Sequence, residues 1–132
     1  MKVKILEESS YKVVAVMDGD LCPAEDFLKN GEKSTYASRI GLERFLEHIA
    51  ANGLQKMPAA WSHEVDKPNG IYELSKGRLR LFYFRGHGEQ IVVCTDGSMK
   101  KGPKVDKQSV ARAVDYKNQY FQAVRNKQIE VT

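Results

Sequence analysis

The order of apolar and polar residues predicts that the chain begins with two paired strands. Residues 2–6 alternate between polar and apolar side chains, and residues 11–19 are rich in β-branched residues. The short polar run at residues 8–10 separates them and suits a turn. We therefore expect an N-terminal hairpin within residues 1–20.

A pair of helices is predicted over residues 23–52. Pro23 suits the first turn of a helix that Asn30-Gly31 would end. Ser34 or Thr35 is placed to cap a second, longer helix, because apolar residues then recur at helical spacing.

The next segment, residues 54–70, is predicted to be an irregular connection because it contains Pro58, Pro68 and Gly70. Trp61 and His63 lie within it and are expected to pack the connection against the sheet that follows.

Three strands are predicted next, at about residues 71–75, 78–85 and 89–95. Side chains of a strand alternate between its two faces. In the middle strand this rule places one set of apolar residues on one face, namely Leu79, Leu81 and Tyr83. The other face carries Arg80, Phe82 and Phe84. An arginine that shares a face with two aromatic rings is the unusual feature of this strand.

A basic loop at residues 96–105 leads to a last predicted helix, from about Asp106 to Lys127, which the Asp106 side chain can cap. No internal repeat, low-complexity tract or linker divides the chain. A length of 132 residues suits a single domain.

Charge is distributed unevenly along the chain, whose formal net charge is +4. Residues 1–70 hold nine Lys or Arg and eleven Asp or Glu, whereas residues 71–132 hold twelve and six. The excess is concentrated in residues 76–107, with eight cations against three carboxylates. A basic half suits a nucleic-acid partner, and an ordinary solvated basic face is the alternative.

Other site chemistries find little support in the sequence. Cys22 and Cys94 match no metal-ligand spacing; Cys94 is expected to be a small buried residue, and Cys22 an incidental loop residue. The histidines are isolated, and phosphate-binding and nucleophile-elbow motifs are absent, so we expect neither metal nor cofactor. Without an apolar leader or membrane span, a cytoplasmic location with no membrane partner is expected.

Phosphoryl transfer without a metal is the remaining candidate, because RNA carries its own nucleophile in the 2′-hydroxyl group. Arg80 would bind the scissile phosphate, since a guanidinium group can hold two phosphate oxygens. Lys100, Lys101 or Lys104 would add positive charge or act as an acid or base. Further RNA contacts are predicted at Lys76, Arg78, Arg85, His87, Lys104 and Lys107.

Structural roles are open for the same residues. Arg80 could pair with Glu73 across the strands, and the lysines could belong to a solvated loop. Tyr83 and Phe82 suit a core better than a base-stacking platform, and His87 suits a turn.

The segment from Gly70 to Phe121 resembles the C-terminal half of the RelE/HigB-like toxin superfamily, and in particular its phage-derived HigB-like branch. The matching elements are the strand Gly70–Leu74, the strand Leu79–Phe84, the apolar strand and loop from Ile91 to Lys101, and the helix that begins near Asp106. The match covers about half of the chain, and the preceding helix pair fits more loosely.

This resemblance implies a compact α+β domain in which a small, mainly antiparallel sheet packs against an N-terminal helix pair, with a further C-terminal helix. It implies an mRNA interferase of a toxin–antitoxin system that acts on translating ribosomes and binds a cognate antitoxin as a hetero-oligomer. Arg80 falls on the arginine that the family uses at the scissile phosphate, and Lys100 and Lys101 fall on its basic loop.

The chain also departs from the family pattern. Its last helix lacks a counterpart of the C-terminal tyrosine or histidine that many of the ribonucleases carry, so the catalytic acid and base are unassigned. Two alternatives stay open: a gyrase inhibitor resembling the ParE branch, which acts by protein contact, and an inactive RNA- or ribosome-binding member of the same fold.

Overall fold

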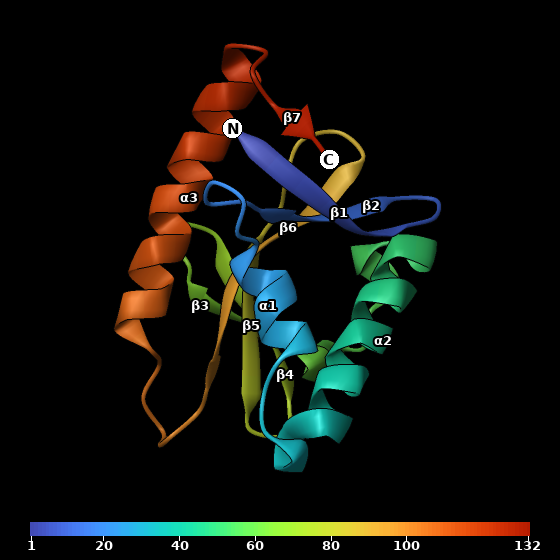
Figure 1. The fold of residues 1–132 in the computed structure, drawn as a ribbon, viewed down its shortest axis with the longest axis vertical. Helices are drawn as coiled ribbons and strands as arrows, with labels where there is room; N and C mark the ends of the chain where they lie inside the picture. Colours follow the sequence, from blue (N-terminus) through green and yellow to red (C-terminus); the bar gives the residue numbers. More distant parts are fainter.

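The computed structural model describes all 132 residues as an α+β fold, with helices packed on a mixed, mostly antiparallel sheet (Figure 1). The strands are β1 (Lys2–Glu8), β2 (Lys12–Val16), β3 (Ser62–Asp66), β4 (Ile71–Lys76), β5 (Leu79–Phe84), β6 (Gln90–Met99) and β7 (Glu130–Val131). The helices are α1 (Pro23–Lys29), α2 (Tyr36–Asn52) and α3 (Lys107–Arg125), and short 3-10 turns span Lys33–Thr35, Leu54–Lys56 and Ala59–Trp61.

The seven strands form one sheet in the order β3-β4-β5-β6-β2-β1-β7. The predicted hairpin is confirmed, since β1 and β2 pair antiparallel with a register shift between Ile5 and Glu7. Two pairings are parallel, β2 with β6 and β1 with β7. The first of these joins the N-terminal hairpin to the antiparallel meander β3-β4-β5-β6 and so makes a single sheet.

The helices cover opposite faces of the sheet: α1 and α2 lie on one side and α3 on the other (Figure 1). The predicted alternation in β5 is confirmed by the two cores that result. Leu79, Leu81 and Tyr83 belong to the core beneath α1 and α2. Phe82 and Phe84 belong to the core beneath α3. Burial of each such large side chain stabilises the fold by about 1.5–3 kcal/mol.

Two predicted segments were wrong, and one strand was not predicted. Residues 54–70 are not wholly irregular, because they include β3, which pairs antiparallel with β4. The last strand of the meander continues to Met99, so the basic loop begins at Lys100 rather than at residue 96. The chain also ends in β7, which no pattern of the sequence indicated.

Several predicted residue roles also needed correction. Cys22 is buried at 5% exposure in the first core and is not incidental. Thr35 occupies the N-cap position of α2, but its hydroxyl accepts a hydrogen bond from Arg39 instead of capping the helix. Trp61 stacks on Phe45 of α2, with ring centroids 3.9 Å apart, whereas His63 is exposed on the edge strand β3.

Candidate functional site

One concave surface contains four of the nine predicted site residues: Arg80, Lys100, Lys101 and Lys104. We call it the basic hollow; its volume is about 690 Å³. It lies between the α3-facing surface of β4 and β5 and the loop that joins β6 to α3. Its lining consists of Glu73, Arg80, Phe82, Ser98, Met99 and residues 100–106. The sequence-based expectation that these cations share a concave surface therefore agrees with the structure.

Arg80 lies at the back of the basic hollow, where its side chain is 16% exposed. Its Nη1 donates hydrogen bonds to the carbonyl oxygens of Gly77, at 2.8 Å, and Leu79, at 2.9 Å. Its Nε lies 3.6 Å from Oε1 of Glu73 and makes no hydrogen bond. The backbone therefore fixes one edge of the guanidinium group, while no hydrogen bond within the protein uses Nη2.

Glu73 is the site residue that the sequence pattern does not single out. From the sequence it is expected only as a partner of Arg80, and the two do lie at ion-pair distance. The carboxylate is also part of the lining of the basic hollow, and the residue is 9% exposed. The one usable signal is the position of this carboxylate between the apolar residues Tyr72 and Leu74 of β4. It lies directly opposite Phe82, which puts both side chains on the same face.

Lys100, Lys101 and Lys104 are exposed, and none of them forms an ion pair. The backbone N–H of Lys100 donates to the carbonyl of Arg78 at 2.7 Å, which holds the start of the loop against the β4–β5 turn. The three ammonium groups are thus available to an anion that enters the hollow.

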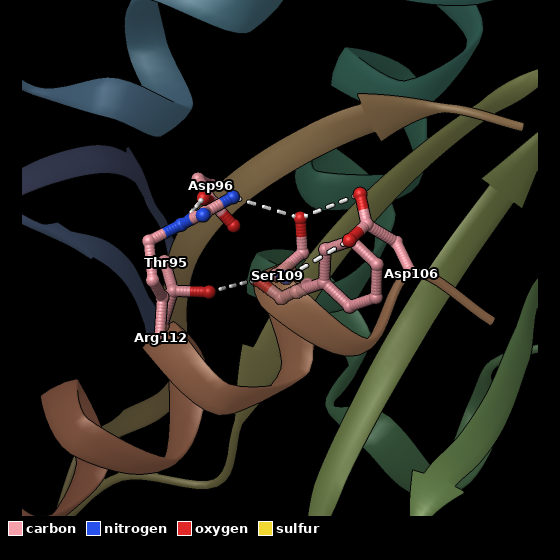
Figure 2. A network of polar contacts seen from close by, with 6 residues as sticks. Thr95, Asp96, Asp106, Ser109 and Arg112 are labelled. Carbon is pink, nitrogen blue, oxygen red and sulfur yellow. Dashed lines mark hydrogen bonds and ion pairs between the residues drawn. The ribbon is translucent and has the colours of Figure 1, made fainter.

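A polar network connects β6 to the start of α3, on the two sides of this loop (Figure 2). Asp96 on β6 accepts a hydrogen bond from Nε of Arg112 on α3 at 2.9 Å. Nη2 of Arg112 donates to the hydroxyl of Ser109 at 3.0 Å, and that hydroxyl donates to Asp106 at 3.0 Å. Asp106 also accepts the backbone N–H of Ser109 at 3.1 Å, so the predicted cap of the last helix is confirmed.

The fold shifts the pKa values of the two carboxyl groups of the network in opposite directions. Burial raises the pKa of Asp96, and the hydrogen bond and charge of Arg112 oppose that rise. Hydrogen bonds from Ser109, the backbone N–H foremost, lower the pKa of Asp106. Asp106 therefore stabilises the start of α3 as a carboxylate, beside the positive end of the helix.

The other five predicted RNA contacts lie outside the basic hollow. Lys76 points to the opposite face of the sheet, 5.9 Å from the ring centroid of Phe45 in α2. Arg85 lies over Tyr72, at 5.1 Å, and borders a different cavity of about 340 Å³.

His87 is exposed in a turn, as expected, and borders a third cavity beside Tyr120. Arg78 is exposed in the β4–β5 turn. Lys107 begins α3 and borders a neighbouring groove. The structure therefore gathers the residues predicted to be catalytic and disperses most of those predicted only to bind RNA.

No protein-family model matches this chain, and no curated protein matches it. No cluster of three or more His, Cys, Asp or Glu side chains that could hold a metal ion is present. None of the helices combines the length and the apolar character needed to cross a bilayer.

Proposed function

We propose that the chain is an mRNA interferase toxin that binds single-stranded RNA in the basic hollow and cleaves its backbone. The observation that carries this proposal is the convergence of Arg80, three lysines without ion-pair partners and a mostly buried carboxylate on one concave surface. Such a surface suits a phosphodiester group, whose charge becomes more negative as it is attacked.

We assign the role of proton acceptor to Glu73, because its carboxylate borders the hollow and accepts no hydrogen bond within the protein. In the proposed step Glu73 accepts the proton of the 2′-hydroxyl as the O2′–P bond forms. The P–O5′ bond breaks, and a lysine ammonium group of the loop returns a proton to O5′. The products are a 2′,3′-cyclic phosphate and a 5′-hydroxyl.

The cations would act by stabilising the charge that develops on the phosphate oxygens. Nη2 of Arg80 makes no hydrogen bond within the protein, and the loop lysines line the same hollow. Loss of one such interaction typically raises the barrier by about 2.7–4 kcal/mol, which is roughly a hundred- to thousand-fold in rate.

The partners in this proposal are mRNA on the ribosome and an antitoxin that neutralises the toxin. They follow from the resemblance of residues 70–121 to the RelE/HigB-like toxins, which is independent of the geometry. An antitoxin that covers the basic hollow would need carboxylates to match its cations.

The test is tightly controlled expression followed by mapping of mRNA ends and assay of DNA damage. We expect growth arrest with new ends within translated codons, and none with the double variant Lys100→Ala/Lys101→Ala. The matched control is Lys33→Ala/Lys56→Ala, which removes the same charge from exposed positions that do not line the hollow. DNA damage with intact mRNA would instead support the gyrase inhibitor, and absence of toxicity the inactive RNA-binding member.

A further inference from the structure

A second concavity adjoins the basic hollow. We call it the side groove; its volume is about 490 Å³, and Val65, Lys67, Pro68, Val105, Lys107 and Val110 are among its lining residues. Val105 lines both the side groove and the basic hollow, so the two concavities meet at this residue. Because Val105 is 44% exposed, an apolar surface lies open to solvent at the junction.

The side groove combines apolar walls with cations. Lys67 and Lys107 are exposed and form no ion pair. The one carboxylate of its lining, that of Asp66, already accepts hydrogen bonds from the backbone N–H and the side-chain amide of Asn69, at 3.2 and 2.8 Å. The charge that remains available to a ligand is therefore positive.

A nucleotide within a strand suits this combination. Its flat base can contact the apolar walls, and its anionic phosphate can contact the lysines. We propose that the side groove is a subsite for the base of the nucleotide next to the phosphate held in the basic hollow. The inference rests on the proposed function and deepens it, because it assigns a place on the protein to the base beside the bound phosphate. The substrate must be single-stranded, because a base that is paired and stacked in a duplex offers no free face to Val105.

The subsite predicts that bases, and not only phosphates, contribute to affinity. A suitable probe is an eight-nucleotide single strand with deoxyribose sugars, which lacks the attacking 2′-hydroxyl and is not cleaved. Its comparison strand has the same backbone but abasic sugars. We expect the wild-type protein to bind the strand with bases about fivefold more tightly, at the lower end of the range for a base stacked on an aromatic ring, because the groove is lined by aliphatic side chains.

The variant Val105→Ser should lose this preference and still bind the abasic strand as the wild type does. Its matched control is Val131→Ser, since Val131 is 43% exposed and lies in β7 at the other edge of the sheet. Fluorescence anisotropy measures both affinities, and circular dichroism checks that each variant is folded.

The outcomes separate the two proposals. Equal affinity of the wild type for both strands, or a base preference that survives Val105→Ser, would overturn the subsite and leave phosphate binding in the basic hollow intact. If neither strand binds, the proposed function fails, and the subsite fails with it.

Discussion

The proposed function gives the pair Arg80 and Glu73 a part in chemistry beside its part in stability. Both are mostly buried, and each is the nearest opposite charge for the other in the hollow. Removing one partner of such a pair leaves a buried charge without compensation, whereas removing both does not. In the sequence analysis, pairing with Glu73 and binding of a phosphate are alternative roles for Arg80. The geometry allows both, because Arg80 lies at ion-pair distance from Glu73 and also lines the hollow.

A double-mutant cycle tests this coupling. We expect Arg80→Ala to lower the free energy of unfolding by about 1–3 kcal/mol, and Arg80→Ala/Glu73→Gln to recover part of that loss. Urea unfolding followed by the fluorescence of Trp61, the only tryptophan, gives these values and that of Glu73→Gln alone, which completes the cycle. A cost of the double variant equal to the sum of the two single costs would show that the two groups are not coupled.

Asp106 gives a pH-dependent prediction. Since its pKa is lowered in the fold from an ordinary value of 3.8, its contribution is present above that value and is lost as the pH falls through the folded pKa. Near neutral pH we expect Asp106→Ala to cost about 0.5–2 kcal/mol.

The difference between the Asp106→Ala variant and the wild type should shrink as the pH falls below 3.8. The exposed residue Asp115 of α3 provides the control: Asp115→Ala removes the same charge but no cap, and should change stability by less than about 0.5 kcal/mol. Equal costs for the two variants at all pH values would contradict the capping role.

Among the elements, β6 and α1 approach closely enough to require a glycine. An ideal Cβ at Gly97 would lie 2.3 Å from the nearest atom of the Phe27 ring. We expect Gly97→Ala to destabilise the protein by about 1–3 kcal/mol through overpacking. Gly102→Ala is the control, since no atom lies within 4 Å of that position. Thermal unfolding compares them, and equal stabilities would show that α1 can move away without cost.

The elements also show where sequence patterns were sufficient. The alternation in β5, the Pro23 start of α1 and the Asp106 cap are local signals, and each predicted its element. The strand β3 was missed because its exposed residues His63 and Glu64 obscure the apolar alternation. The parallel pairing of β2 with β6 joins segments far apart in the chain, and no local pattern encodes such a pairing.

For the whole molecule, the uneven charge gives a prediction about salt. The net positive half of the chain supplies β4, β5, β6 and the loop before α3, which line the basic hollow. Binding of a single strand should therefore weaken as salt rises, with a slope of about −0.7 in log–log form for each phosphate that a cation neutralises.

The double variant Lys100→Ala/Lys101→Ala should have a shallower salt slope than the wild type, by about 0.7 for each phosphate that the missing lysines would have neutralised. The control Lys33→Ala/Lys56→Ala should keep the wild-type slope. Anisotropy titrations at several salt concentrations measure it. Identical slopes for all three proteins would mean that these two lysines do not bind phosphate.

The part of the site that could be predicted from the sequence lies on one strand, β5, and on the loop after β6. Arg80, Lys100 and Lys101 follow from neighbouring segments that the antiparallel pairing of β5 and β6 brings together. The places of Glu73 and of the side groove depend on the register of β4 and on residues of β3 and α3 that line one groove. Those are tertiary features, which residue order alone does not specify.

The chemical groups at the cleaved RNA ends test the proposed attack by the 2′-hydroxyl most directly. New mRNA ends formed on induction should carry a 2′,3′-cyclic phosphate on the upstream fragment and a 5′-hydroxyl on the downstream fragment, and should be absent with Lys100→Ala/Lys101→Ala. Ends with a 3′-hydroxyl and a 5′-phosphate, or unchanged cleavage by the double variant, would contradict the proposed role of the basic hollow.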